Sequence, residues 1–414
     1  MNPSEQSSKD LNIILLMGLF PPQIRADIEL NSKGVIQYAA DALQWSIVKG
    51  FGNFCNLCNL KIINLPFIGS YPLRFKTFRS KAFSFEHRKD ADDFNVGFLN
   101  LPIVKMFSRY INAKKALKKT MLHCDGKTVI VIYSINSPFL CAAVDIKRKY
   151  PNTKICVIVP DLPQYMSDTK NVFYHSLKSV DSLFIKRAIN EVDFFVLLSD
   201  YMTEVLRINS RPYVRVEGIY NPSDSMDVVA KEKNKTILYS GTLARRYGIM
   251  NLVNAFGAID KPDYRLWICG DGDCRTEIEN RAKIDSRIIY LGQLSRAEVL
   301  VLQKRATVLV NPRTSEGEFT KFSFPSKIME YLASGTPCII HRLKGIPDEY
   351  FQYCFVCVKE NVDGLKDVIL AVCGKEQSEL DDFGGKAARF IKEQKNPTVQ
   401  VKKIYDMLMK YHGE

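Results

Sequence analysis

The stretch PSKIMEYLASGTP, residues 325–337, places a hydroxyl, a cation and a carboxylate within two turns of a predicted helix. Pro325 suits the first helical position, and Ser326 and Lys327 then fall in the first turn. A lysine there opposes the helix dipole unless an anion shares the site. Glu330 follows Lys327 by three residues, so both lie along one face and Glu330 is expected to reach hydroxyl donors such as those of a ribose. A surface Lys–Glu pair is the alternative.

A second candidate is the loop GTLARRYG, residues 241–248, at the end of the predicted strand 236–241. The turn at Gly241 lets the backbone approach an anion, and the guanidinium groups of Arg245 and Arg246 can clamp phosphate oxygens. This loop suits a diphosphate, although an ordinary turn with solvated arginines is equally consistent with it. The patterns G-x-x-x-x-G-K-[ST] and G-x-G-x-x-G are both missing, which disfavours nucleoside triphosphate hydrolysis and dinucleotide redox chemistry.

Both loops must be positioned by regular elements, and the sequence predicts parallel sheets wrapped by helices. Short runs rich in Ile and Val recur, each followed by a stretch of helical period. The predicted strands are 11–18, 61–68, 94–99, 128–134, 154–159, 193–199, 213–218, 236–241, 264–270, 288–292, 307–312, 337–341 and 354–358. We predict a Rossmann-like domain over 1–220, a polar linker over 221–235, a second Rossmann-like domain over 236–375, and C-terminal helices over 376–414 that pack across both.

The composition excludes several classes of protein. A chain of 414 residues, 46% hydrophobic and 25% charged, is neither a peptide hormone nor a fibrous or disordered chain. No apolar run reaches the roughly 18 residues that span a bilayer, and the polar start MNPSEQSSKD does not resemble a secretion signal. Eleven cysteines, mostly in apolar runs, are distributed like free cytosolic thiols, and two C-x-x-C pairs lack His partners at zinc spacing. We expect a soluble cytoplasmic protein without a metal site.

Taken together, these motifs resemble those of the GT-B glycosyltransferases of the large retaining family four, the group 1 transferases. The similarity rests on PSKIMEYLASGTPCI, the preceding NPR and the loop GTLARRYGI, over about residues 235–345. It implies an α/β fold of the GT-B type, with two Rossmann-like domains whose parallel sheets face each other across a cleft. The resemblance also implies that Glu330 binds the nucleotide ribose. Ser326 and Lys327, with Arg245 or Arg246, would hold the diphosphate.

The resemblance extends to the loops Gly270-Asp271-Gly272 and Gly292-Gln293-Leu294, which are similar to the family's loops around the base. The residues expected to bind the donor are therefore Gly34, Gly241, Thr242, Arg245, Arg246, Gln293, Ser326, Lys327 and Glu330. In the first phosphate loop the family's usual arginine and lysine are replaced by Thr242 and Tyr247. We expect the reach of a guanidinium group to cover this displacement.

One departure concerns the sugar. Phe322 stands eight residues before Glu330, where the family usually has an acid that contacts the sugar. Candidates to replace that acid are Glu316, Glu318, Thr320 and backbone amides. Sugar recognition is therefore expected to differ from the family pattern.

The first half is expected to bind the acceptor. Gly34 begins the predicted helix VIQYAADALQWSIV, with Asn31 as its cap, and in the family a small residue there faces the donor phosphates. Asp161 follows the strand 154–159, where related enzymes carry a His or an acid beside the reacting sugar. Its carboxylate can accept a proton or stabilise a cationic centre, or it can simply cap its own turn. Asp161 is the candidate catalytic residue.

The function implied by the resemblance is transfer of a sugar, with retention, from a UDP- or GDP-linked donor to a glycan or lipid-linked acceptor in surface polysaccharide biosynthesis. In such enzymes the leaving diphosphate helps to deprotonate the acceptor, so no carboxylate nucleophile, metal or other cofactor is expected. Two alternatives share the architecture. One is a non-hydrolysing epimerase of UDP-sugars, and the other is a non-catalytic GT-B scaffold subunit, which the Phe322 departure keeps open.

The net charge of +13 is unevenly distributed, because residues 61–127 hold 14 Lys and Arg against 5 Asp and Glu. Residues 71–83 interleave aromatic and basic side chains, and the predicted helix 103–122 adds six more cations. Such a pattern suits an anionic membrane surface. It is also consistent with binding to single-stranded RNA or with a solvated edge. We favour peripheral attachment to the inner face of the cell membrane through residues 71–119 and expect no nucleic-acid partner.

Overall fold

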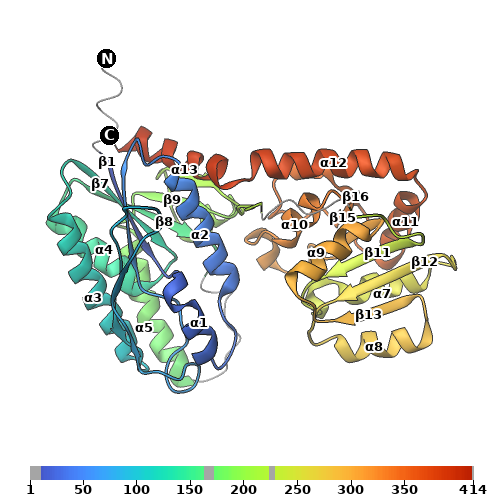
Figure 1. Cartoon of the computed structure of the whole chain (residues 1–414), viewed down its shortest axis with the longest axis horizontal. Coiled ribbons are helices and arrows are strands. Elements are labelled where there is room, and N and C mark those ends of the chain that lie inside the picture. The colour runs from blue at the N-terminus through green and yellow to red at the C-terminus, as the bar shows by residue number, and fades with distance from the viewer. Residues whose placement is uncertain (1–10, 163–171, 223–228, 413–414) are drawn as a thin grey trace, which may run out of the picture. The chain divides into compact units, whose positions relative to one another are not determined.

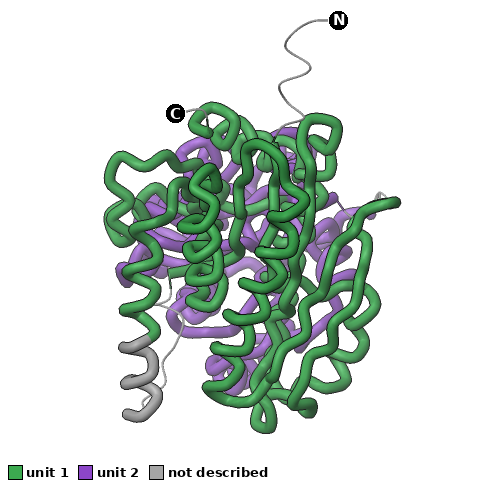
Figure 2. The backbone as a smooth tube through the Cα atoms, turned by 90° about the vertical axis from the view of Figure 1, so that its left-hand side faces the viewer, with its two compact units in different colours: residues 1–219, 397–414 green, residues 220–396 purple. Residues whose placement is uncertain are grey.

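The structure, a computed structural model, describes residues 11–162, 172–222 and 229–412. The chain divides into two compact units (Figures 1 and 2). Unit 1 comprises residues 1–219 and 397–414, and unit 2 comprises residues 220–396. Each unit contains its own mainly parallel sheet with helices, so the predicted α/β class with two Rossmann-like domains is confirmed. The predicted tail 376–414 is divided between the units, since the chain re-enters unit 1 at Pro397.

Unit 1 is built on an eight-stranded sheet of order β10-β9-β8-β7-β1-β2-β5-β4, parallel except between β4 and β5. Its strands are β1 (Leu11–Met17), β2 (Asn59–Asn64), β4 (Phe83–Phe85), β5 (Asp93–Asn95), β7 (Lys127–Tyr133), β8 (Thr153–Val159), β9 (Phe194–Leu197) and β10 (Tyr213–Arg215). The central strands β1 and β7 are buried along nearly their whole length. Strands covered on both faces are apolar throughout, which is why periodicity predicted them well.

The helices of unit 1 form two sets. α3 (Val104–Met121), α4 (Ser137–Lys149) and α5 (Val172–Ile189) lie side by side, and α2 (Tyr38–Gly52) packs against α13 (Pro397–Tyr411) (Figure 1). Two shorter helices are α1 (Pro22–Asn31) and α6 (Met202–Leu206). Ile13 and Leu15 of β1 share a buried cluster with Ile47 of α2 and Val401 of α13. The last helix therefore completes the core of the first unit.

The predicted strand 94–99 is wrong as a single element. Its residues divide between β5 and a separate strand, β6 (Phe98–Leu99), which pairs antiparallel with β3 (Arg79–Ser80). The Asn112 side chain donates to the carbonyl oxygen of Gly97 at 2.9 Å, which takes this bend out of the sheet ladder. A Cβ atom at Gly97 would lie 2.9 Å from the Ser80 carbonyl oxygen, so the two short segments pack backbone to backbone.

Unit 2 is built on a six-stranded parallel sheet of order β13-β12-β11-β14-β15-β16. Its strands are β11 (Lys235–Ser240), β12 (Tyr264–Cys269), β13 (Ile288–Gly292), β14 (Val308–Asn311), β15 (Cys338–His341) and β16 (Phe355–Cys357). Its helices are α7 (Ile249–Gly257), α8 (Arg275–Ile284), α9 (Arg296–Arg305), α10 (Lys327–Ala333), α11 (Val362–Cys373) and α12 (Gln377–Gln394). Ser295 and Glu298 form a capping box that fixes the start of α9 at the pocket described below.

Candidate functional site

A pocket of about 590 Å³ lies in unit 2 where β11, β12 and β14 end. Ligands of open parallel sheets bind beyond the carboxyl ends of the strands, because loops and helix starts meet there. We term it the carboxyl-edge pocket. Of the residues that the sequence assigns to donor binding, five line it: Gly241, Thr242, Gln293, Ser326 and Lys327. The structure thus brings together segments that are up to 86 residues apart in the chain.

The loops after β11 and β12 are in direct backbone contact at the pocket. Gly270 has φ +135°, and a Cβ atom there would lie 1.8 Å from the carbonyl oxygen of Gly241. The amide of Gly241 donates to the carbonyl oxygen of Cys269 at 3.0 Å, and the amide of Leu243 donates to the carbonyl oxygen of Asp271 at 2.9 Å. Only glycine allows both the dihedral angle and the close approach. Gly270, which the sequence associated with the base, thus supports the phosphate loop.

Lys327 and Glu330 point the same way, as their spacing predicted. The Lys327 Nζ atom lies 2.8 Å from Glu330 Oε1, which also accepts from Gln303 Nε2 at 2.7 Å. Glu330 Oε2 has a 3.9 Å ion pair with Arg296 Nε, and the Glu330 side chain is 17% exposed. Oε1 therefore already accepts two hydrogen bonds within the protein, whereas Oε2 has only the long ion pair with Arg296 among the described residues. Glu330 itself does not line the pocket, whereas Lys327 and Ser326 do.

The start of α10 differs slightly from the prediction. Hydrogen bonding begins at Lys327 with Ser326 at the N-cap, so Pro325 precedes the cap and is not the first helical residue. Ser326 already has helical dihedral angles, and the Ile328 amide donates to the Pro325 carbonyl oxygen at 2.9 Å. The turn is thus begun by Pro325 but too tightly wound to count as α-helix, and it still presents Ser326 and Lys327 to the pocket.

The α10 helix is anchored to β11 through a buried tyrosine. The Tyr331 hydroxyl accepts from the Ser240 amide at 2.8 Å and donates to the Ser240 carbonyl oxygen at 3.0 Å. Burial raises the pKa of Tyr331 well above its ordinary value, so the hydroxyl keeps its proton as a donor. No local sequence pattern indicated this contact, which holds the Lys327 turn against the Gly241 loop.

The structure does not bring Arg245 or Arg246 into the pocket. The Arg245 guanidinium lies 2.5 Å from Glu277 of α8 and is 67% exposed. Arg246 is exposed as well and lies over the ring of Tyr247 at 5.1 Å. Both belong to a single turn of 3-10 helix, Arg245–Tyr247, and neither guanidinium group lines the pocket. Three other residues of this loop line the pocket: Gly241, Thr242 and Tyr247.

Arg313 supplies the cation that the sequence analysis did not assign. Its side chain is 8% exposed, lines the pocket, and lies between the rings of Phe319 and Tyr247 at 4.7 and 5.4 Å. Nη2 donates to Ser323 Oγ at 2.8 Å, while the buried Nε has no partner in the described part of the chain. Arg313 forms no ion pair with a described carboxylate, and burial lowers its pKa. The NPR triplet after β14 was the available signal.

The candidates to replace the missing sugar-binding acid do not line this pocket. Glu318 is 78% exposed and pairs with Lys321, and Glu316 is exposed. Thr320 is buried and donates to the carbonyl oxygen of Gly317 at 2.8 Å. Phe322 ends the short 3-10 turn that carries these residues. Backbone groups therefore remain as the alternative named from the sequence.

Asp161 lies at the end of β8 in unit 1, beside the end of β7. Asp161 is exposed, and partial desolvation of its carboxyl group raises its pKa. Burial, and then the charge of Asp161, raise the pKa of Tyr133, the last residue of β7. A carboxylate and a phenol thus both lie at the carboxyl edge of the first sheet. The following residues 163–171, which continue the predicted loop, lie outside the described residues.

Gly34 and Asn31 do not occupy the positions that the sequence predicted. α2 begins at Tyr38 with Gln37 at its N-cap, so Gly34 lies four residues before the helix in an exposed loop. A Cβ atom at Gly34 would meet nothing within 4 Å. Asn31 is the last residue of α1, and its side chain donates to the Asp27 carbonyl oxygen at 2.7 Å. The apolar period extended the predicted helix too far towards its N-terminus.

The loop after β1 is held by buried side chains that sequence reasoning missed. Three successive amides, of Gly18, Leu19 and Phe20, each donate at 2.7 Å, to Gln44, Asn64 and Asp41 respectively. Asp41 also accepts from Arg25 at 2.5 Å. Because these three amides already donate to side chains of the protein, they are not available to bind an anion.

No cluster of three His, Cys, Asp or Glu side chains suited to a metal ion occurs within the described ranges. All eleven cysteines fall in those ranges and are free thiols. No helix of the described part of the chain is long and apolar enough to cross a bilayer.

Residues 234–375, which include every residue that lines the pocket, match the family described as Glycosyl transferases group 1. A curated relative, N-acetyl-alpha-D-glucosaminyl L-malate synthase of Bacillus anthracis, is 23% identical over 169 residues; the match covers 39% of this chain and 42% of that protein.

The solved structures extend the likeness to the whole chain. Sucrose-phosphate synthase from Thermosynechococcus elongatus is similar over 96% of this chain and 99% of its own, with a TM-score of 0.61 and 15% identity. HepE from Anabaena in complex with UDP is similar over 96% and 100%, with a TM-score of 0.59 and 12% identity. The fold is therefore the GT-B fold that the motifs implied.

Proposed function

We propose that this chain, whose residues 234–375 match the group 1 glycosyltransferases within a GT-B fold, transfers a sugar from a nucleoside diphosphate sugar to an acceptor hydroxyl. The observation that carries the proposal is that two cations line the carboxyl-edge pocket: Lys327, and the buried Arg313, which has no counter-ion among the described residues. A buried cation without a counter-ion is costly in the free protein. A ligand diphosphate would provide the missing negative charge.

The donor is proposed to lie along the pocket, with its diphosphate near Lys327, Ser326 and Thr242. Leu294 and Gln293 after β13 provide an apolar contact and an amide for the base. Glu330 Oε2, on the same face of α10 as Lys327, is the acceptor proposed for the ribose hydroxyls. A UDP- or GDP-linked sugar satisfies these groups, and HepE is similar in fold and was solved with UDP.

We propose that the transfer retains the configuration of the sugar. Negative charge develops on the leaving diphosphate, and Lys327 and Arg313 would stabilise it from a partly desolvated site. The departing phosphate oxygen would take the proton of the acceptor hydroxyl, so the reaction needs no carboxylate nucleophile. Asp161, whose carboxylate has a raised pKa, is proposed to stand beside the reacting sugar and stabilise its cationic character. An acceptor assay followed by NMR of the anomeric proton tests retention, and an inverted product would contradict it.

The acceptor is proposed to be a glycan or lipid-linked saccharide at the cytoplasmic face of the membrane, in surface polysaccharide biosynthesis. Unit 1 supports this location through exposed apolar side chains among cations, including Leu73 at 82% and Phe78 at 56% exposure. Arg74, Lys76 and Arg79 alternate with them along the chain. Aromatic rings at headgroup depth with cations over anionic lipid hold a protein on a membrane without insertion.

The first experiment is a thermal-shift screen of the purified chain against UDP, GDP and their sugars. A nucleotide that binds only the folded protein raises its melting temperature. Incubation with the stabilising sugar nucleotide alone then separates the alternatives. Appearance of a sugar isomer indicates an epimerase, release of free sugar or transfer to acceptor indicates a transferase, and no binding at all would leave the scaffold.

Glu330→Ala is the matching test of the site. We expect the dissociation constant for the nucleotide to rise about tenfold or more, because a carboxylate that holds two hydroxyls contributes on the order of 1.5–3 kcal/mol. Isothermal titration calorimetry measures it. Asp363→Ala is the matched control, since Asp363 also pairs with a lysine three residues away, Lys366, but on the exposed surface of α11. Equal binding by the two variants would remove Glu330 from the donor site.

A further inference from the structure

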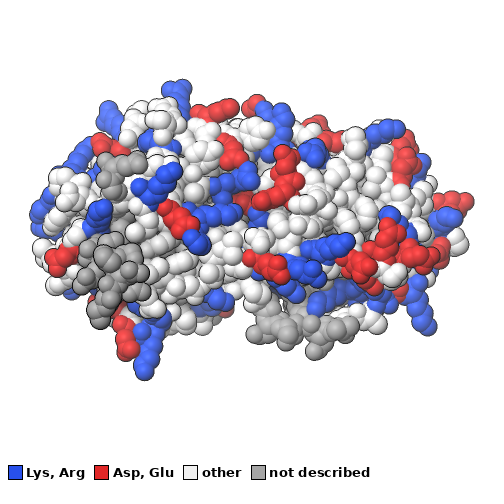
Figure 3. Space-filling model, turned by 90° about the horizontal axis from the view of Figure 1, so that it is seen from above, with Lys and Arg blue, Asp and Glu red and all other residues white. Residues whose placement is uncertain are grey.

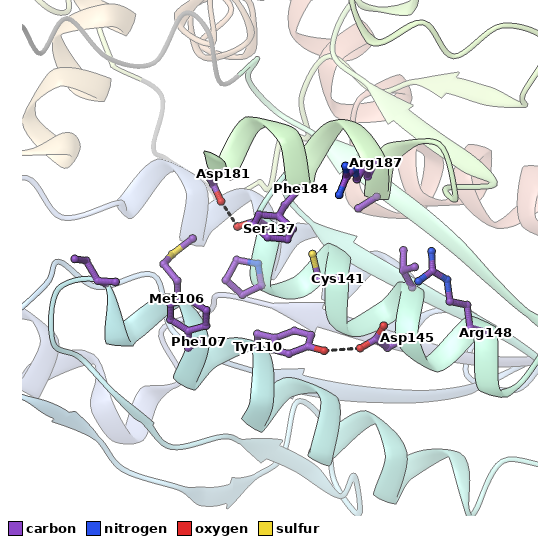
Figure 4. Close-up of a pocket in the computed structure, with 14 residues that line it drawn as sticks. Met106, Phe107, Tyr110, Ser137, Cys141, Asp145, Arg148, Asp181, Phe184 and Arg187 are labelled. Carbon is purple, nitrogen blue, oxygen red and sulfur yellow. Dashed lines mark hydrogen bonds between the residues drawn. The ribbon is translucent and has the colours of Figure 1, made fainter. Parts of the chain in front are cut away.

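A second hollow, of about 720 Å³, lies in unit 1 on the outer surface of the helix layer (Figure 4). It runs along α4, between the N-terminal half of α3 on one side and α5 on the other. We term it the α4 groove. Its volume falls in the range of sites that bind drug-sized ligands. It is separate from the carboxyl-edge pocket and contains none of the residues assigned to donor or acceptor chemistry.

One end of the α4 groove is apolar and open to solvent. Figure 4 shows Met106 and Phe107 of α3 and Phe184 of α5 around this end. Ile103 is 50% exposed, Phe107 is 64% exposed and Phe184 is 52% exposed. Large apolar side chains gathered at one exposed hollow mark a binding surface, whereas single exposed ones are ordinary.

The other end of the groove is cationic. Figure 4 shows Arg148 of α4 and Arg187 of α5 there. Arg148 is 65% exposed and lies 3.1 Å from Glu191, while Arg187 has no ion pair with a described residue. Both guanidinium groups are therefore accessible to an anion at the mouth of the groove.

The polar groups on the floor of the groove are already bonded to one another. The Tyr110 hydroxyl donates to Asp145 at 2.5 Å, Lys114 donates to the same carboxylate at 2.6 Å, and Ser137 donates to Asp181. These groups need no hydrogen bonds from a ligand. An occupant would accordingly be recognised by its apolar length and by a negative charge at one end.

The surrounding helices are strongly basic. α3 carries six Lys and Arg and no acid, while α4 and α5 carry three Lys and Arg and one Asp each. By contrast, acidic and basic side chains are interspersed on the face shown in Figure 3. The charge on the helix layer complements an anionic partner. It also opposes a symmetric dimer, which would place two copies of the same cationic surface against each other.

The apolar surface continues around α3. A hollow of about 760 Å³ on the opposite flank of this helix shares Phe107 and is lined by Leu99 and Ile111, with Lys115 and Lys119 at its border. Apolar side chains thus emerge on both flanks of the N-terminal half of α3, and lysines follow in its C-terminal half. The N-terminal half of α3 thus presents exposed apolar side chains beside lysines that an anionic lipid surface attracts.

We propose that the α4 groove holds one acyl chain of an anionic membrane phospholipid, with the lipid phosphate against Arg148 and Arg187. The proposal rests on the membrane location proposed above, and it does not depend on the chemistry of the carboxyl-edge pocket. The apolar end takes the chain, the guanidinium groups take the phosphate, and α3 lies against the bilayer surface. The groove would thereby orient unit 1 on the membrane.

Vesicle flotation with the full chain tests the proposal. Vesicles of phosphatidylglycerol and of phosphatidylcholine are compared, and we expect at least tenfold tighter binding to the anionic vesicles, weakening as salt is raised. Phe107→Ser with Phe184→Ser, and separately Arg148→Gln with Arg187→Gln, should each weaken that binding about tenfold. The matched controls are Ile284→Ser, at an 82% exposed position of α8, and Lys392→Gln with Lys402→Gln. Equal binding to both vesicles, or equal loss in the controls, would overturn the proposal.

Fluorescence locates the acyl chain. Phe184→Trp places an indole in the groove, and Ile284→Trp is its control. Vesicles with bromine on the acyl chains should quench the first at least twofold more than the second. Vesicle binding without this difference would show attachment by another surface and overturn the proposal. Sedimentation equilibrium tests whether a second copy of the chain occupies the groove. A dimer that dissociates in the Phe107→Ser, Phe184→Ser variant would overturn the lipid proposal. The UDP-induced thermal shift of the serine variants reports the donor site separately.

Discussion

The carboxyl-edge pocket and the α4 groove lie in similar α/β scaffolds but differ in how they are built. The carboxyl-edge pocket sits where parallel strands end, and its cations, Arg313 and Lys327, are buried or held by neighbours. The α4 groove lies on the outer side of a helix layer, and its cations, Arg148 and Arg187, are exposed. The first arrangement suits one small anion in one orientation. The second suits a class of amphiphiles.

The difference is also one of electrostatic strength. A desolvated guanidinium interacts strongly with a bound anion because little water screens it, whereas exposed cations are weakened by salt. We therefore expect a few residues to contribute most of the binding free energy in the pocket, and many residues to contribute a little each on the helix layer. Single substitutions should weaken ligand binding strongly in the pocket and only slightly on the helix layer.

The largest effect is expected from replacing Gly270 of unit 2, where only glycine fits the backbone. Gly270→Ala would place a Cβ atom 1.8 Å from the Gly241 carbonyl oxygen at a φ of +135°. We expect a loss of about 3 kcal/mol or more, which lowers the melting temperature by about 6 to 12 °C, and loss of nucleotide binding. Differential scanning calorimetry measures it.

Gly34→Ala is the comparison in unit 1, where the added Cβ atom meets nothing within 4 Å. It should change the stability by no more than about 0.5 kcal/mol. A stable Gly270→Ala variant that still binds nucleotide would show that the two loops do not need their backbone contact. A large loss of transfer in Gly34→Ala, without a loss of stability, would restore the role that the sequence assigned to Gly34.

The second expected effect separates binding from stability. Arg313→Met removes a buried cation that has no described counter-ion, so we expect nucleotide binding to weaken about a hundredfold. The unliganded protein should melt at the same or a higher temperature, because an apolar side chain costs less to bury there. Calorimetric titration and a thermal melt measure the two effects.

Arg313→Lys is the control, since it keeps the charge but not the planar group between Phe319 and Tyr247. It should bind with an intermediate affinity. If Arg313→Met binds nucleotide as the parent does, or if it melts at a much lower temperature, Arg313 is a packing residue and the pocket lacks its main cation.

The same contrast explains how far the sequence could be interpreted. Buried strands such as β1 and β7 were predictable because two covered faces require an unbroken apolar run. The position of Ser326 and Lys327 at a helix start was predictable because the preference for proline in the first turn depends on neighbouring residues alone. Arg313 was missed because its burial depends on Tyr247, which lies 66 residues earlier in the chain. The start of α2 was missed because an apolar period does not mark where a helix begins.

The α4 groove could not be predicted as a site from the sequence. The basic helix and the aromatic segment before it indicated a membrane surface, but a hollow requires three helices to pack with a gap between them. Exposure of Phe184 is visible only once α5 is placed beside α4. Charge along the chain therefore predicted the class of partner, and packing specified where that partner would bind.

The smallest expected effect concerns the two arginines that the sequence placed at the diphosphate. Arg245 is 67% exposed and its guanidinium is paired with Glu277, away from the pocket lining. Exposed ion pairs contribute little, so Arg245→Ala and Arg246→Ala should each change the dissociation constant for nucleotide by about twofold or less. Calorimetric titration at low and at physiological salt measures this. A tenfold loss in either variant would mean that the loop turns inward when the donor binds and that Arg313 shares the phosphate with it. A change of twofold or less would support binding of the diphosphate by Arg313 and Lys327, with Arg245 and Arg246 as solvent-exposed residues that do not contact the donor.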